Sequence, residues 1–155
     1  AGLARAAGTG LVLDTPTWRA GQTWSAVMGL DPARVRQINL EAVAFAQKLR
    51  ATQETDAMPI LLNGVIGPSG DGYAIDRALS PDESLARHRL QAQTLADAGA
   101  DLVTAVTMTQ ISLAIPTAVM TESREKIKSS APIWAITPQN EFAFAVCPSC
   151  CPSTL

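Results

Sequence analysis

Two polar, turn-forming loops hold the side chains best suited to bind a ligand. The first follows an apolar run at 11–15, and the second, GPSGDGY, follows an apolar run at 60–66. Each run is typical of a β-strand, and each loop precedes an amphipathic helix, which is the order of consecutive β-α units. In such folds the loops at the carboxyl ends of parallel strands carry the chemistry. The first loop offers hydroxyl, indole and guanidinium groups, from Thr15, Thr17, Trp18 and Arg19.

Each of these features also has a purely structural interpretation. The GPSGDGY segment either lines a pocket or is a tight connection in which glycines supply positive φ angles. Trp18 and Arg19 either line a pocket or form a stacked pair on the surface. Asp14 lies inside a strand, so we expect a polar core contact from it rather than catalysis.

The remaining candidates for chemistry are one histidine and three cysteines. His88 falls on the apolar face of a helix, so we expect packing or a hydrogen bond rather than catalysis. Cys147, Cys150 and Cys151 form a C-x-x-C-C pattern, but a tetrahedral sulfur site needs a fourth ligand. We therefore expect no metal bound there, with a zinc-binding tail as a third interpretation. Three cysteines, all near one end of the chain, cannot form a disulfide framework for the rest of the protein. We also expect a cytoplasmic protein.

The strands and helices that position these loops are predicted from the spacing of apolar residues and from the Gly, Pro and capping residues between them. Strands are predicted at 11–15, 60–66 and 100–109, with a loop over 16–31 and a further helix near 111–120. Asp31-Pro32 begins one helix, and Ser80-Pro81-Asp82-Glu83 begins another as a capping box that ends at Gly99. The buried faces are predicted at Val35, Ile38, Ala42, Phe45 and Leu49, and at Leu85, His88, Ala92 and Leu95. Strand–helix alternation predicts a parallel sheet flanked by helices.

Composition excludes several classes of protein. The chain has 155 residues and a formal net charge of −2, with no basic cluster, so nucleic-acid binding is not expected. No apolar run approaches the roughly 18 residues of a membrane span. Only 17% of the residues are charged, which indicates less solvated surface than a free-standing domain of this size shows. The first residue is Ala, which indicates either a start within a longer protein or a processed terminus.

The pattern changes beyond residue 120. APIWAITP at 131–138 is a candidate fourth strand, but the last residues are apolar and then rich in Cys, Pro and Ser without helical or strand periodicity. We therefore divide the chain into 1–120, a set of β-α units, and 121–155, a divergent tail. That tail is either a genuine divergent segment or the product of a reading-frame change or fusion.

Three segments carry a family resemblance. GLVLDTPTWRA, NGVIGPSGDGY and HRLQAQTLADAGADLVTAVTMT resemble, in order and spacing, the homocysteine S-methyltransferase family over about residues 8–120. The resemblance implies an α/β fold, a partial (β/α)8 TIM-type barrel of three to four parallel strands with outer helices. A complete barrel takes about 250 residues, so this chain would supply barrel strands two to four and part of a fifth.

The family's chemistry is methyl transfer to a thiol. Members hold zinc through three cysteine thiolates, and the zinc holds the sulfur of homocysteine as a nucleophilic thiolate. That sulfur attacks an activated methyl group, while the protein supplies orientation and electrostatics. The partners implied are homocysteine and a methyl donor.

The resemblance also implies which positions line the substrate pocket. They lie at the ends of the first two predicted strands: Thr15, Thr17, Trp18, Arg19, Asn63, Gly64, Gly67, Pro68, Asp71, Gly72 and Tyr73. Three family features are missing. Val106 stands where many members have a Glu that grips the amino group of homocysteine, and the Asp-Gly-Gly turn of strand one and the first zinc cysteine are absent.

These observations predict a fragment of a methyltransferase that forms methionine from homocysteine. We expect it to be inactive alone and to bind no zinc, although the full-length family does. The alternative is a small non-catalytic α/β binding or assembly module. In either case open sheet edges favour self-association.

Overall fold

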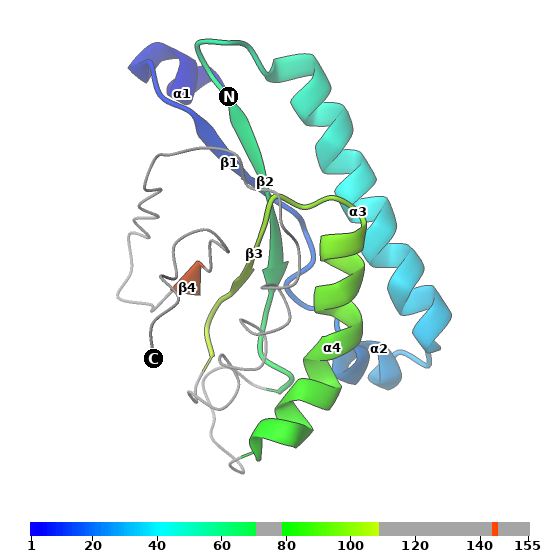
Figure 1. Cartoon of the computed structure of the whole chain (residues 1–155). Coiled ribbons are helices and arrows are strands. Elements are labelled where there is room, and N and C mark those ends of the chain that lie inside the picture. The colour runs from blue at the N-terminus through cyan, green and yellow to red at the C-terminus, as the bar shows by residue number, and fades with distance from the viewer. Residues whose placement is uncertain (71–78, 109–143, 146–155) are drawn as a thin grey trace.

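The computed structural model describes residues 1–70, 79–108 and 144–145. After a short N-terminal helix, helices separate the first three strands (Figure 1). In chain order they are α1 Gly2–Ala7, β1 Leu11–Asp14, α2 Gln22–Val27, α3 Pro32–Gln53, β2 Ile60–Ile66, α4 Pro81–Asp97, β3 Leu102–Ala105 and β4 Phe144–Ala145.

The first three strands form one parallel sheet in the order of the sequence. β1 pairs with β2, where Leu13 lies opposite Leu62, and β2 pairs with β3, where Gly64 lies opposite Val103. This confirms the predicted parallel, adjacent strands. The two-residue β4 runs antiparallel to β3 and so adds no fourth parallel strand. The candidate strand 131–138 and the candidate helix near 111–120 lie outside the described residues.

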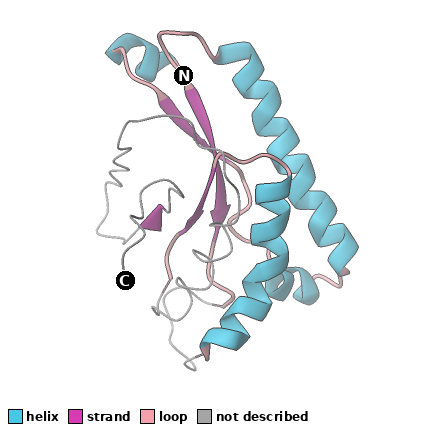
Figure 2. Cartoon of the chain, viewed as in Figure 1, coloured by secondary structure: helices cyan, strands magenta, loops and turns pink. Residues whose placement is uncertain are grey.

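Two long helices cover one face of this sheet (Figure 2). α3 begins as predicted, with the Asp31 carboxylate accepting from the Arg34 backbone N–H at 2.7 Å. α4 begins with the predicted capping box of Ser80 and Glu83, and Gly99 follows its end with a φ of +94°. None of the described helices is long and apolar enough to cross a membrane.

The core lies between these helices and the sheet, in two clusters of buried side chains. One is Val43, Ile66, Ala92, Leu95 and Val103, and the other is Ala46, Met58, Ile60 and Leu62. Gly64 lets α4 approach β2, since a Cβ there would lie 3.1 Å from Leu95. The second cluster packs the amino ends of β1 and β2 against α3 through apolar contacts.

Two details of the helices differ from the prediction. The segment 16–31 was predicted as loop but contains α2, whose apolar Val27 is exposed and therefore gave no periodic signal. The buried face of α3 is Val35, Asn39, Val43 and Ala46, whereas Phe45 is 56% exposed. Asn39 is buried because its amide donates to the Val35 and Ala20 carbonyls, which a hydrophobic pattern does not reveal.

One carboxylate links α3, β2 and the start of β3. Asp101 Oδ2 accepts from Arg50 Nη1 and from the Leu62 backbone N–H, each at 2.7 Å. The Leu62 residue is fully buried, so its N–H has no access to water when the carboxylate is removed. Asp101 therefore fixes where β3 begins relative to β2.

We expect Asp101→Ala to lower the free energy of unfolding by roughly 2 kcal/mol, because it leaves a buried N–H and a guanidinium without their shared acceptor. Urea unfolding followed by circular dichroism measures this. The matched control is Glu41→Ala, which breaks the exposed Arg34–Glu41 pair at 3.4 Å and should cost less than about 0.5 kcal/mol. Equal costs for the two variants would contradict this role of Asp101.

Candidate functional site

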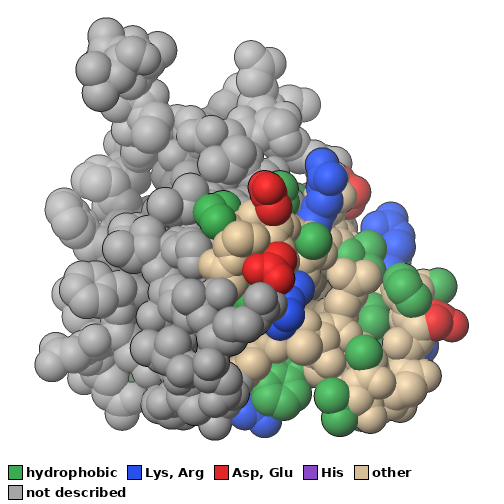
Figure 3. Space-filling view, turned by 90° about the horizontal axis from the view of Figure 1, so that it is seen from below, with side chains coloured by type: hydrophobic (Ala, Val, Ile, Leu, Met, Phe, Trp, Pro, Cys, Tyr) green, Lys and Arg blue, Asp and Glu red, His purple; other side chains and the backbone are tan. Residues whose placement is uncertain are grey.

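The carboxyl ends of β1, β2 and β3 lie at one edge of the sheet, the lower edge in Figure 1. The residues that follow them are Thr15–Trp18 after β1, Gly67–Ser69 after β2 and Val106–Met108 after β3. The predicted pocket residues within the described range therefore come from neighbouring strand ends or from the strands themselves. Seen from this end, the visible described surface mixes apolar, basic and acidic groups, with no patch of a single charge (Figure 3).

Thr15 and Thr17 are buried, and their hydroxyls extend the pairing of β1 with β2. Thr15 Oγ1 accepts from the Val65 backbone N–H at 3.1 Å, and Thr17 Oγ1 donates to the Val65 carbonyl at 2.7 Å. The two hydroxyls lie 2.7 Å apart. Since both are occupied with the Val65 backbone, these threonines shape the site and present no free hydroxyl to a ligand.

Trp18 connects all three strand ends. Its indole Nε1 donates to Thr107 Oγ1 at 3.1 Å, beyond β3, and its carbonyl accepts from the Gly67 N–H at 2.9 Å, beyond β2. Gly67 needs to be glycine because a Cβ there would lie 2.5 Å from the Trp18 carbonyl oxygen and 2.6 Å from its indole nitrogen. The reason is close approach rather than a positive φ, which Gly67 does not have.

Thr107 belongs to the candidate site, although the sequence did not reveal it. Its φ is +54°, a conformation that few residues other than glycine adopt, and it follows β3 at the edge where the other loops meet. Its hydroxyl accepts from Trp18 and donates to the Val106 carbonyl at 2.7 Å. Only the position of Thr107 at a strand end could have drawn attention to it.

Arg19 and two tryptophans form what we term the indole cluster: Trp18, Arg19 and Trp24. The Arg19 guanidinium carbon lies 4.9 Å from the Trp18 ring centre and 4.4 Å from that of Trp24. Trp24 Nε1 donates to the Pro68 carbonyl at 3.0 Å, so the cluster is attached to the loop after β2. The stacked pair considered from the sequence is therefore present, with Trp24 as a third member.

A chain of polar side chains crosses the inner face of the sheet, opposite the helices. Asn63 Nδ2 donates to Asp14 Oδ1, and Thr104 Oγ1 donates to Asn63 Oδ1, each at 2.8 Å. The Asp14 residue is exposed, whereas Asn63 and Thr104 are buried. Asp14 thus makes a polar contact, as expected, but the expected place in the core is wrong, because Asp14 is exposed. Gly64 faces α4 instead of this face.

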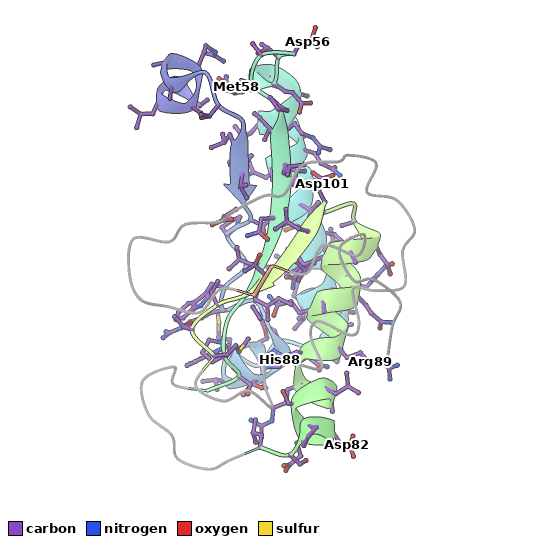
Figure 4. The ribbon with its side chains drawn as sticks, turned by 60° about the vertical axis from the view of Figure 1, so that its left-hand side comes forward. Asp56, Met58, Asp82, His88, Arg89 and Asp101 are labelled. Atoms are coloured by element: carbon purple, nitrogen blue, oxygen red, sulfur yellow. The ribbon has the colours of Figure 1, made fainter. Side chains whose placement is uncertain are left out.

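His88 lies on the buried face of α4, as predicted, but without a hydrogen bond to its Nε2. Burial, with a smaller contribution from the neighbouring Arg87 charge, lowers the pKa of His88 from 6.5 to about 4. Its imidazole is therefore neutral at pH 7. Figure 4 shows His88 and Arg89 on opposite sides of α4.

Within the described residues, no three His, Cys, Asp or Glu side chains lie close enough to hold a metal ion. The described part of the strand-end site thus does not fit a zinc ion. Cys147, Cys150 and Cys151 lie outside the described residues, as do Asp71, Gly72 and Tyr73. Val106 does pair with β2, its N–H donating to the Ile66 carbonyl at 2.9 Å, and offers no acid.

We expect Gly67→Ala to lower the free energy of unfolding by roughly 2 to 3 kcal/mol and to change the near-ultraviolet circular dichroism of the tryptophans, because the new methyl group overlaps Trp18. Gly70→Ala is the matched control, since a Cβ at Gly70 meets nothing within 4 Å. An unchanged tryptophan signal in Gly67→Ala would show that the two loops do not touch.

We also expect His88 to make stability depend on pH. His88 takes up a proton below pH 6.5 in the unfolded chain but only below about pH 4 in the folded chain. Burial of His88 therefore does not lower the free energy of unfolding above pH 6.5, and lowers it increasingly as the pH falls. The full penalty is roughly 3 kcal/mol near pH 4. Unfolding free energies at pH 7.5 and 5.0 should differ less in His88→Gln than in the parent chain, which has no other histidine. An identical difference in both would contradict the lowered pKa.

Comparison with known proteins identifies a family that matches this chain. The family described as "Homocysteine S-methyltransferase" matches residues 5–141. No curated protein matches the chain significantly. Two crystal structures of the homocysteine methyltransferase MmuM from Escherichia coli match at 28% identity, the oxidized form with a TM-score of 0.64 and the metallated form with 0.63.

The matched region covers 70% of this chain but only 40% of the oxidized and 41% of the metallated MmuM chain. The three parallel strands and their helices thus correspond to part of the barrel of that enzyme. The family match covers most of the 155 residues and includes every predicted strand end discussed above. The chain belongs to the homocysteine S-methyltransferase family.

Proposed function

We propose that this chain forms part of an enzyme that transfers a methyl group to the thiol of homocysteine and so makes methionine. The observation that carries the proposal is the junction of three strand ends through Trp18, Gly67 and Thr107, at the edge where barrel enzymes bind substrates. The family match and the likeness to MmuM support the same chemistry. A cytoplasmic location is part of this proposal.

In this proposal the described residues bind and orient substrates. Thr15 and Thr17 fix the end of β1 against β2, and the indole cluster supplies an apolar wall with a cation stacked on it. The remaining proposed pocket positions are Asn63, Gly64, Gly67, Pro68, Asp71 and Tyr73. Holding a sulfur and a methyl group in line within such a wall lowers the entropic part of the barrier.

Zinc would supply the thiolate chemistry in the complete enzymes of the family. Because the described residues do not fit a metal site, we assign no step of the reaction to zinc in this part of the chain. What this part contributes is a rigid polar and aromatic edge. Val106 also cannot bind the amino group of homocysteine, so the acceptor's ammonium would be held elsewhere.

We expect the isolated 155-residue chain to form no methionine from homocysteine with either S-methylmethionine or betaine, with or without added zinc. The physical reason is that its described residues provide three parallel strands and no metal cluster, while MmuM is matched over only 40% of its length. Radioactive methyl transfer measures this. Zinc-dependent methionine formation by the chain alone would overturn the expectation.

Size-exclusion chromatography and denaturant unfolding distinguish two hypotheses: that the chain is part of a methyltransferase, and that it is a non-catalytic binding or assembly module. An open piece of a barrel exposes apolar side chains that the rest of a barrel would cover, and here Val12 on the inner face of β1 is 40% exposed, with Phe45 and Leu49 exposed on α3. The methyltransferase proposal therefore expects self-association. A compact monomer that unfolds cooperatively would favour the module instead.

A further inference from the structure

A chain of polar side chains on the inner face of the sheet ends in a carboxylate. Asp14, the last residue of β1, accepts a hydrogen bond from Asn63 Nδ2, and Asn63 Oδ1 accepts one from the Thr104 hydroxyl, each at 2.8 Å. A carboxylate can only accept, so the Asn63 amide presents its nitrogen to Asp14 and its oxygen to Thr104. Asn63 and Thr104 therefore hold the Asp14 carboxylate in one orientation.

The two residues that orient Asp14 are buried, whereas Asp14 itself is accessible. Asn63 and Thr104 are only 7% and 6% exposed, and Asp14 is exposed. The inner face of a barrel is usually filled with branched apolar side chains, and a buried hydrogen bond adds little net stability. We therefore attribute the two buried polar side chains to the carboxylate that they orient.

The negative charge of Asp14 has no cationic partner among the described residues. Neither ion pair found there includes Asp14. Arg19, the nearest basic residue in the sequence, lies over the Trp18 and Trp24 rings, 4.9 and 4.4 Å from their centres. A carboxylate has about four positions that accept hydrogen bonds, and the described residues fill one of them. Asp14 can therefore accept several N–H donors from a small cation.

Asp14 lies at the edge of the sheet where we propose that substrates bind. The hydroxyls of Thr15 and Thr17, which follow it, are occupied by hydrogen bonds to the β2 backbone. Val106 comes two residues after Thr104, so it faces the same side of the sheet, but it has no acid. Within β1, β2, β3 and the described residues directly after them, Asp14 is the one acidic side chain.

We propose that Asp14 binds the ammonium group of the acceptor amino acid, with Asn63 and Thr104 as positioning residues that aim its carboxylate. This inference rests on the proposed function, because the acceptor in that reaction is homocysteine, whose amino group is protonated at neutral pH. An ammonium group supplies three N–H donors and a positive charge, which match the remaining acceptor positions and the charge of Asp14. Asp14 would therefore select α-amino thiols over thiols that lack the amino group.

The test compares two thioethers that differ only in the amino group. Methionine, the product of the proposed reaction, carries the ammonium, and γ-methylsulfanylbutyrate does not. Saturation-transfer NMR on the full 155-residue chain measures the binding of each through its S-methyl signal, and it also works when a protein self-associates. We expect saturable binding of methionine, about tenfold tighter than the binding of γ-methylsulfanylbutyrate.

Two variants and a control locate the effect. Asp14→Asn keeps the shape of the side chain but removes its charge, so methionine should bind about tenfold more weakly, while γ-methylsulfanylbutyrate should bind equally or more tightly. Thr104→Val removes only the hydroxyl that orients Asn63, so methionine should bind about threefold more weakly. The matched control is Asp56→Asn, the same change at an exposed residue before the amino end of β2, at the opposite edge of the sheet (Figure 4).

Folding is checked by urea unfolding, in which Asp14→Asn should match the parent chain because Asp14 is exposed. Methionine binding that Asp14→Asn weakens and Asp56→Asn keeps, with γ-methylsulfanylbutyrate binding not weakened, supports the proposal. Equal methionine binding in the parent chain and Asp14→Asn overturns the role of Asp14, and the methyltransferase proposal then stands. Equal weakening of both thioethers in Asp14→Asn overturns the contact with the ammonium group. A parent chain that binds neither thioether overturns, in addition, the substrate-binding role proposed for these strand ends.

Discussion

The register of three parallel strands is the constraint on which the rest of the molecule depends. Because Asp14 lies opposite Asn63 and Val65 lies opposite Thr104, the loops that follow the strands emerge at one edge. The pairing does not stop where the strands end. Thr15 and Thr17 extend this pairing, because their hydroxyls form hydrogen bonds with the Val65 backbone. The first loop therefore leaves the sheet in a fixed direction. Trp18 can then reach Gly67 and Thr107.

This arrangement gives the two faces of the sheet different properties. The inner face carries the chain from Asp14 through Asn63 to Thr104, in which each amide or hydroxyl orients its neighbour. The helix face is apolar at the amino ends of the strands, but near the strand-end loops it becomes polar, with Gln91, His88 and Ser84 buried on α4. The Trp18 loop lies between the two regions.

Much of the fold could be predicted from the sequence because its signals are local. Capping residues at Asp31 and Ser80 and apolar runs at β1 and β2 each depend on neighbours within a few residues. The connection of Trp18 to Thr107 could not be predicted, since it joins residues 89 positions apart and depends on one unusual backbone angle. The reason for Gly67 was likewise hidden, because a glycine needed for close contact looks the same in sequence as one needed for a turn. Asn39 and Gln91 were missed because polar side chains that pair with each other are buried without a hydrophobic pattern.

The central claim is that the three runs are adjacent parallel strands whose ends form one site. Backbone distance measurements by NMR on the 155-residue chain, in solution or in the solid state, test it most directly. We expect contacts between Leu13 and Leu62 and between Gly64 and Val103, together with contacts from the Trp18 ring to Thr107. Antiparallel contacts between these runs, or a Trp18 ring remote from Thr107, would contradict the parallel arrangement and the shared site.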